Sequence, residues 1–285
     1  MGSRVMISES WYETTQRKVR AVLQKGIVEP LGRFPVSELT FEDVDLLVAR
    51  RRTKSIENGR EVGGVEAARK FRKELVRMLA FAEKTGLVNA NAAARSDKVK
   101  VAAGKRSTGY HSWTEKEITQ YRNEYALGTK ARLAMELLLW TGQRRGDVVH
   151  LGRNHIRDGA LDIRQAKGGK ALTIPVARRL VEAIDAMPAN DSLNFLVTEK
   201  GKAFTNAGFG NWFRERCDQA GLPQCTAHGL RKAAMRRMAE LGMSNSFLKA
   251  MSGHTRDNEV AIYTAAADQK RLAASAVNAL SEWDS

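Results

Sequence analysis

Thr141-Gly-Gln-Arg-Arg-Gly-Asp147 is the first of four short stretches around which the second half of the chain is organised. The others read, in chain order, Lys167-Gly-Gly-Lys170, His228-Gly-Leu-Arg231, and Gly253-His254 with Tyr263 nine residues after the histidine. They collect side chains that bind phosphates, move protons or act as nucleophiles. The regular elements expected around them decide the fold.

Periodicity places these stretches at the ends of helices and strands. The apolar run 132–141 predicts a helix that ends at Gly142. Alternating residues over 160–163 and 171–176 predict two short strands joined by the glycine turn, and Thr114-Glu-Lys-Glu117 is a capping box that opens a helix. Further helices are expected over about 177–187, 206–220, 227–241, 245–252, 257–265 and 268–282. This half is therefore mainly α with a small β-sheet.

The first half carries only helical signals. Helices are expected over 11–24, ended near Gly26, and over 41–52 with Thr40 as N-cap. The strongest pattern covers 66–85 and stops at Gly86. One face of that helix is basic, which fits either a solvated surface or a DNA-facing one. Its cations are Arg69, Lys70, Arg72, Lys73 and Arg77.

Residues 96–112 are small, polar and basic, with two glycines and no apolar periodicity, which is typical of a linker. We therefore expect an all-α domain over 1–103, a linker over 104–112 and an α+β domain over 113–285. The length suffices for two domains with cores of their own.

The amino-acid composition limits which classes of partner and cofactor are expected. Lysine and arginine number 47 against 32 acidic residues, a net charge of +15 that favours a polyanion. No stretch of about 18 apolar residues and no signal-peptide run is present, so a cytoplasmic protein without a membrane span is expected. Cys217 and Cys225 are expected to be reduced thiols. Without zinc spacing or a full phosphate-loop motif, we expect no metal, no ATP and no other cofactor.

The residue types in the four stretches suit chemistry on a phosphodiester. Arg144 and Arg231 are permanent cations whose forked donors match phosphate oxygens, so they can stabilise charge without a metal. Tyr263 offers a phenol oxygen able to form a covalent intermediate. His228 and His254 can orient groups or move protons. A lysine on a hairpin can reach a leaving oxygen.

Together these stretches resemble the tyrosine site-specific recombinases of the phage integrase family. The shared pattern is an arginine after Thr-Gly-x, a hairpin lysine, His-x-x-Arg, Gly-His and a tyrosine nine residues later, over roughly residues 110–270. Each motif alone is weak, but all five in this order are specific. The resemblance implies an enzyme that integrates or excises a phage or mobile element. It also implies that the first half is a core-DNA-binding domain of SAM-like fold.

By this resemblance the family's roles fall on matching residues. Tyr263 is expected to attack the scissile phosphate, leaving a 3′-phosphotyrosyl link and a free 5′-hydroxyl. Arg144 and Arg231 are expected to clamp the phosphate, while Lys167 protonates the leaving 5′-oxygen. His228 is expected to assist proton transfer, and His254 to hydrogen-bond the phosphate. The supporting residue Asp147 is expected to orient Arg144 or its helix.

The resemblance also implies partners. Double-stranded DNA with attachment or recombination sites is the expected ligand, bound by a homotetramer on synapsed DNA, with a monomer or dimer in solution. Apolar residues in the C-terminal segment have helical spacing, so this helix packs on its own domain or docks on a neighbouring protomer. Many phage integrases carry an extra N-terminal arm-binding domain. Here the helical signal starts near Ser8, so we expect a simple recombinase or a chain shortened at its start.

Plainer interpretations remain open. Arg144 can solvate a helix end, Tyr263 can be a packed aromatic beside Ile262, and Lys170 competes with Lys167. The same chemistry would also serve chromosome-dimer resolution or a topoisomerase. A helical DNA-binding regulator is the non-enzymatic alternative, because 228–251 can be read as a helix-turn-helix. Only an enzyme of this type would become covalently attached to DNA.

Overall fold

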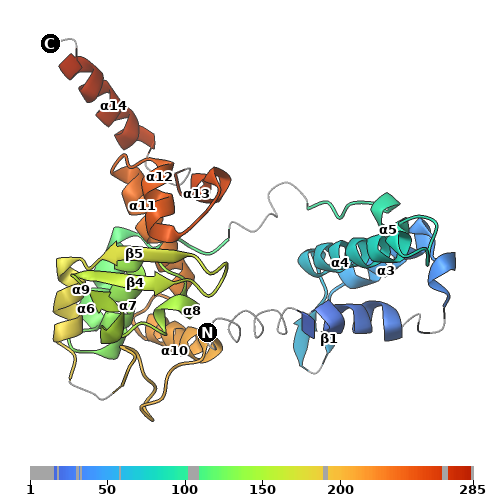
Figure 1. Ribbon diagram of the computed structural model, residues 1–285, viewed down its shortest axis with the longest axis horizontal. Helices are drawn as coiled ribbons and strands as arrows, with labels where there is room; N and C mark the ends of the chain where they lie inside the picture. The colour runs from blue at the N-terminus through green and yellow to red at the C-terminus, as the bar shows by residue number, and fades with distance from the viewer. Residues whose placement is uncertain are drawn as a thin grey trace. The chain divides into compact units, whose positions relative to one another are not determined.

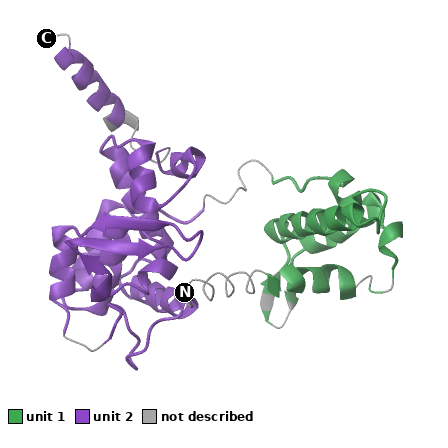
Figure 2. Ribbon diagram, in the orientation of Figure 1, with its two compact units in different colours: residues 1–107 green, residues 108–285 purple. Residues whose placement is uncertain are grey.

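The structure, a computed structural model, describes residues 16–17, 19–29, 32, 34–57, 59–101, 109–188, 192–264 and 269–283. The chain divides into two compact units, residues 1–107 and 108–285, each with a hydrophobic core (Figure 2). The expected linker, 104–112, is described only from Gly109 onward. That described part lies against the second unit, where Tyr110 contacts the His228 ring and His111 binds Glu117.

The first unit is built on two packed helices. Its elements are η1 (Gln24–Val28), η2 (Val36–Glu38), α3 (Phe41–Arg52), β1 (Ser55–Glu57), β2 (Arg60–Val62), α4 (Val65–Lys84) and α5 (Ala92–Arg95). Thr40 caps α3 in a capping box with Asp43, which confirms the predicted start. Phe71, Leu75 and Leu79 on α4 are buried against α3, so the apolar face predicted from the spacing does pack into a core.

Two features of this unit differ from expectation. Strands β1 and β2 form an antiparallel hairpin, with Ser55 paired to Val62, that the helical signals do not predict. Helical structure also continues past Gly26 as the π-helical turn η1. A Cβ on Gly26 would lie 2.2 Å from the Phe71 ring, so this glycine provides room for packing instead of ending the helix. Residues 11–15 and 18 of the predicted first helix lie outside the described residues.

The second unit is mainly helical with one small sheet, which confirms the predicted fold class (Figure 1). Strands β3, β4 and β5 form an antiparallel sheet in that order, with Leu161 paired to Ile174. The short elements β3, α8 and η3 were not predicted. The elements are α6 (Glu115–Glu124), α7 (Lys130–Thr141), α8 (Arg145–Val148), η3 (Arg153–His155), β3 (Ile156–Arg157), β4 (Ala160–Arg164), β5 (Ala171–Pro175), α9 (Arg178–Asp185), α10 (Asn206–Gln219), α11 (Ala227–Glu240), α12 (Asn245–Ser252), α13 (Asp257–Thr264) and α14 (Gln269–Trp283).

Helix α7 is the centre of this unit. It packs against α9 and α11, and its Leu133, Leu137 and Leu138 are buried. The helix ends at Gly142, whose φ of 60° is left-handed. A Cβ there would also lie 2.7 Å from the Met235 side chain on α11. The tight turn at Gly142 therefore delivers residues 143 and 144 beside α11.

Helix α14 confirms the predicted C-terminal helix and exposes apolar side chains. Val277, Leu280 and Trp283 are 60%, 63% and 85% exposed. Among the described residues, no helix combines the length and the apolar character needed to span a membrane.

Candidate active site

The predicted site residues come from separate elements of the second unit. Helix α11 packs against α12 and α13 (Figure 1) and against α7, and three residues separate the end of α7 from the start of α8, so segments far apart in sequence meet at α11. The residues are Arg144 at the N-cap of α8, Lys167 in the β4–β5 turn, His228 and Arg231 on α11, His254 after α12, and Tyr263 on α13.

Arg231 is the buried anchor of the site and is only 1% exposed. Its Nη1 donates to the carbonyl oxygen of Gly142 over 2.7 Å, and its Nη2 to that of Ser252 over 3.0 Å. These carbonyls lie at the ends of α7 and α12, where helices leave acceptors without partners. A buried charge is tolerated when it is hydrogen-bonded in this way. The guanidinium is thereby held in one position.

His254 is buried beside Arg231, with its Nε2 3.0 Å from Nη2 of the arginine. Because arginine has only donors, Nε2 must accept, so the proton of the neutral ring sits on Nδ1. Nδ1 then donates to Ser252 Oγ over 2.7 Å, and that hydroxyl donates to the carbonyl of Leu248. Burial, followed by the charges of Arg231 and Arg144, lowers the pKa of His254 to about 4. The ring is therefore neutral at pH 7.

Tyr263 faces this pair. It is 3% exposed, and its ring centre lies 5.7 Å from that of His254. Burial, followed by the charge of Arg144, lowers the pKa of Arg231, and the neighbouring Tyr263 offsets part of this lowering. Its neighbour Ile262 is 60% exposed. Tyr263 is thus a buried aromatic, as the plainer interpretation holds, but it is buried against the proposed phosphate-binding groups.

Arg144 brings a second guanidinium to the same place. Its Nη1 is buried and donates to no group in the part of the chain that the structure describes. Its charge contributes to lowering the pKa values of Arg231, His254 and His228. A bound anion would relieve the repulsion between the two guanidinium groups. The site is therefore suited to an anionic ligand.

His228 lies in the first turn of α11, which Thr226 caps by accepting from the backbone N–H of Gly229. Its ring is exposed on one side and packs on the other against Tyr110, with centres 4.8 Å apart. Partial burial, then the charges of Arg231 and Lys232, lower the pKa of His228. This edge of the site offers a neutral imidazole that solvent or substrate can reach.

The β4–β5 hairpin carries the lysines. Lys167 is exposed and, among the described residues, makes no hydrogen bond or ion pair with the other predicted site residues. Lys170 is partly buried, with its Nζ 3.5 Å from the carbonyl oxygen of His254. Asp147 accepts a hydrogen bond from the backbone N–H of Ala166 over 2.8 Å. The Asp147 carboxylate thus binds the hairpin, while the Asp147 backbone N–H donates to the carbonyl oxygen of Arg144 over 2.8 Å at the start of α8. The role expected for Asp147, orienting Arg144 or its helix, stays a prediction.

Three buried polar residues that support the site were not predicted from the sequence: Gln143, Gln165 and Ser252. Each lies one or two positions from a predicted site residue. An uncharged polar residue directly beside a motif was the only available signal, and it is a weak one.

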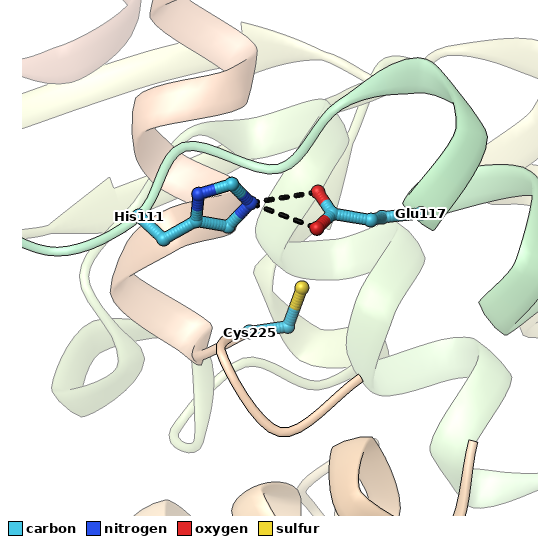
Figure 3. A group of neighbouring side chains, drawn as sticks. All are labelled: His111, Glu117 and Cys225. Carbon is cyan, nitrogen blue, oxygen red and sulfur yellow. Dashed lines mark hydrogen bonds and ion pairs between the residues drawn. The ribbon is translucent and has the colours of Figure 1, made fainter. Parts of the chain in front are cut away.

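Outside this site, a histidine, a carboxylate and a thiol meet at the start of α6 (Figure 3). His111 Nε2 lies 2.8 Å from Glu117, and the potential ligand atoms, including Cys225 Sγ, lie within 4.8 Å of one another. These described residues are the ones that could hold a metal ion. Yet both oxygens of Glu117 already accept hydrogen bonds, from His111, Thr114 and Gln224, and these bonds account for the cluster without an ion.

Cys217 and Cys225 are free and buried. Burial raises the pKa of Cys217 to about 12 and also raises that of Cys225. Both thiols therefore stay protonated at neutral pH, and a buried, protonated thiol is unreactive. Two free cysteines agree with the reduced thiols expected from the sequence.

A protein-family model described as the phage integrase family matches residues 113–270, which is more than half of the chain. The chain belongs to the phage integrase family. This confirms the resemblance to tyrosine site-specific recombinases, because all four quoted stretches lie inside the matched residues.

Two curated members of the family are similar to this chain. The shufflon-specific DNA recombinase of Escherichia coli is 29% identical over 170 residues, covering 59% of this chain and 42% of that protein. The prophage integrase IntZ of Escherichia coli strain K12 is 28% identical over 141 residues, covering 48% and 32% respectively. The matched part thus spans less than half the length of either relative.

Solved structures of family members share the fold. A lambda integrase dimer bound to a COC′ core site matches with a TM-score of 0.71 at 22% identity, over 88% of this chain and 71% of that one. The Tn1549 transposon integrase in complex with circular intermediate DNA matches with a TM-score of 0.73 at 15% identity, over 93% and 92%. A lambda integrase tetramer bound to a Holliday junction matches at 0.69 and 23% identity, over 86% and 73%.

Proposed function

We propose that this protein is a site-specific DNA recombinase of a phage or mobile element that cleaves and rejoins DNA through a 3′-phosphotyrosyl intermediate. The observation that carries the proposal is the position of Tyr263 beside the buried pair Arg231 and His254. The charge of Arg144 acts on the same pair, and the buried Nη1 of Arg144 has no partner among the described residues. A phenol next to two guanidinium groups has the elements of an anion-binding nucleophilic site.

The scissile phosphate would fill the place where positive charge is uncompensated. Arg144 and Arg231 would each donate to its non-bridging oxygens, and His254, which accepts from Arg231 Nη2, would help to orient that guanidinium. Because Arg231 is fixed by two carbonyl oxygens before substrate arrives, little reorganisation is needed when charge develops on phosphorus. The guanidinium groups supply the positive charge that other phosphoryl-transfer sites take from metal ions.

In the cleavage step the Tyr263 oxygen forms a bond to phosphorus and the bond from phosphorus to the 5′-oxygen breaks. Lys167 would give a proton to the leaving 5′-oxygen, and His228 would receive the phenol proton, which suits its lowered pKa. The product is a 3′-phosphotyrosyl link and a free 5′-hydroxyl. Attack by a 5′-hydroxyl from a second strand reverses the step and rejoins the DNA, so no nucleotide cofactor is consumed.

Asp147 would support this reaction through the hairpin. Its carboxylate accepts from the N–H of Ala166, the residue before Lys167. The same residue lies on α8, which begins directly after Arg144. Asp147 would therefore fix the position of the proposed acid, Lys167, relative to the phosphate-binding Arg144.

The proposed partner is double-stranded DNA bearing recombination sites, bound at the nucleoid by a homotetramer on synapsed DNA. The net charge of +15 supports a DNA ligand. The exposed apolar residues of α14 offer a surface for contact with a neighbouring protomer. The first unit, with the basic residues of α4, would be the core-binding domain, and residues 104–112 would join it to the catalytic domain.

The test is covalent capture. The protein and its Tyr263→Phe variant are mixed, without magnesium, with a library of randomised nicked suicide duplexes, and the products are run on a denaturing gel. A protease-sensitive shifted band that needs Tyr263 supports the proposal, and the trapped DNA identifies the site. Relaxation of supercoiled DNA without sequence preference would favour a topoisomerase. Duplex binding without any covalent product would favour a regulator.

A further inference from the structure

Gln165 links the lysine hairpin to the buried centre of the site. It directly follows β4 and closes the β4–β5 turn. Its backbone N–H donates to the carbonyl of Lys170 over 2.9 Å, and its own carbonyl accepts from Gly169 over 3.1 Å. The residue is only 2% exposed. The main chain of Gln165 thus belongs to the hairpin, while its side chain is buried in the interior.

The side-chain amide reaches the groups that hold the arginine. Nε2 of Gln165 donates to the carbonyl of Ser252 over 2.8 Å and to Oε1 of Gln143 over 2.6 Å. The carbonyl of Ser252 is the one to which Arg231 Nη2 also donates. One oxygen therefore receives both the hairpin amide and the phosphate-binding guanidinium.

The orientation of this amide pair is determined by its surroundings. Gln143 directs Nε2 at two carbonyls, those of Thr141 at 3.0 Å and Met251 at 2.7 Å, so its oxygen must face Gln165. Gln165 in turn must direct its nitrogen at that oxygen and at Ser252. Reversing either amide would bring oxygens together, and a buried polar group without a partner is costly.

Close packing removes the remaining freedom. Gly253 follows Ser252, and a Cβ on it would lie between 2.4 and 2.6 Å from three atoms of the Gln165 amide group. The side chain is therefore confined against the backbone that leads to His254. The exposed turn ahead of it, with Gly168 and Gly169 at positive φ, has no comparable restraint.

We propose that Gln165 is a positioning residue that sets where Lys167 stands relative to the phosphate held by Arg231. This rests on the proposed function, because it assumes that Lys167 is the general acid. Lys167 is two residues from Gln165, and its side chain is free to swing, so the fixed base of the hairpin limits its reach. A displacement of about 1 Å of a reacting group can cost about 100-fold in rate.

The test compares two leaving groups. On the DNA site captured by the wild-type protein, cleavage is measured with an ordinary phosphodiester and with a 5′-bridging phosphorothiolate. Sulfur leaves without a proton donor because a thiol is far more acidic than an alcohol. Gln165→Met, which keeps the volume and loses both hydrogen bonds, should cleave the ordinary site about 10- to 100-fold more slowly than wild type. On the phosphorothiolate it should match wild type, as Lys167→Ala should.

The matched control is Thr173→Val on β5 of the same hairpin. It removes a hydrogen bond to Asp162 that is exposed to solvent, and it should leave both rates unchanged. Gln165→Glu provides a second variant of the same size, whose carboxylate would face two oxygen acceptors. It should show the same rescue by sulfur.

Each outcome bears on a different claim. A slow Gln165→Met protein that sulfur does not rescue, while sulfur rescues Lys167→Ala, would overturn the proposal and assign Gln165 to Arg231 or to stability. Unfolding of both Gln165 variants at the reaction temperature would likewise make the residue structural. Wild-type protein without a covalent product would instead remove the proposed function, and the inference with it.

Discussion

Arg231 donates a hydrogen bond from Nη2 to Nε2 of His254 over 3.0 Å, and both residues belong to the same chain as the tyrosine that faces them. The pair is assembled by the contacts of α11 with α12 and α13. The proposed nucleophile and the proposed phosphate-binding pair lie within one chain and need no partner subunit to complete them. The arrangement therefore predicts which subunit's tyrosine cuts the DNA.

Cleavage is expected in cis. Tyr263→Phe and Arg231→Ala are each expected to abolish covalent attachment to DNA. Mixed in equal amounts, they should remain inactive, because no chain in the mixture has both the tyrosine and its own Arg231. The measurement is covalent capture on the suicide duplex. Recovery of the product in the mixture would show that the tyrosine is delivered to another subunit's phosphate-binding pair.

An oxyanion should stabilise the empty site. Sulfate well above its dissociation constant should raise the free energy of unfolding of wild type by about 1–3 kcal/mol, through selective binding to the folded state. Arg144→Ala should lose most of this gain, because Arg144 brings the unpaired donor. Urea titrations at matched ionic strength in chloride and sulfate measure it. Arg178→Ala, at a side chain that is 93% exposed, is the control, and equal gains in both variants would count against an anion site.

Stability should fall in acid through His254. Its pKa is about 4 in the folded protein, below the ordinary value of 6.5. Between these values the unfolded chain binds more protons, so the full contribution is present above pH 6.5 and is lost as the pH falls toward 4. Urea titrations at pH 7 and pH 4.5 should show wild type losing about 2–3 kcal/mol more than His254→Asn. The exposed His150→Asn should behave like wild type; if His254→Asn does too, the ring is not buried as described.

The fold could be predicted from the sequence where one local signal decides an element. Thr40 and Thr114 start α3 and α6 because their hydroxyls and the carboxylates three residues on satisfy the first free N–H groups. The hairpin β1–β2 and the short helix α8 gave no such signal. Gly26 was wrongly predicted to end the first helix. A glycine is needed there because the Phe71 ring, 45 positions along the chain, leaves no room for a side chain. Such a contact is invisible until the helices pack.

The site divides in a similar way. Arg144, Arg231, His254 and Tyr263 could be singled out as candidates, because side chains of this chemistry in that order are unusual. The groups that hold these side chains in place could not be predicted from the sequence. Arg231 is fixed by backbone carbonyls, and an acceptor present in every residue leaves no trace in the sequence. The Asp147 carboxylate likewise accepts from a backbone N–H, that of Ala166, so the sequence does not reveal this contact.

Lys167 and Lys170 should differ in their effects on cleavage. Lys167→Ala should slow covalent attachment by about 100-fold or more, the range for loss of a general acid. Lys170→Ala should have a far smaller effect, because its Nζ already lies 3.5 Å from the His254 carbonyl. Single-turnover rates on the captured site compare the two. The reverse order would move the acid to Lys170, whose side chain is nearer to the buried centre in the free protein.

Gly253→Ala should destabilise the protein more than Gly242→Ala. Both glycines have left-handed backbones, with φ of 75° and 78°, so both substitutions carry a conformational cost of about 1–2 kcal/mol. A Cβ at Gly242 meets nothing within 4 Å, whereas one at Gly253 meets the Gln165 amide at 2.4 Å. The extra loss at Gly253 should be about 1–3 kcal/mol, the usual cost of overpacking. Urea unfolding measures both, and Gln165→Ala should recover part of the loss in the Gly253→Ala background. Equal losses at the two glycines would mean that the Gln165 side chain moves aside freely and is not confined at the base of the hairpin.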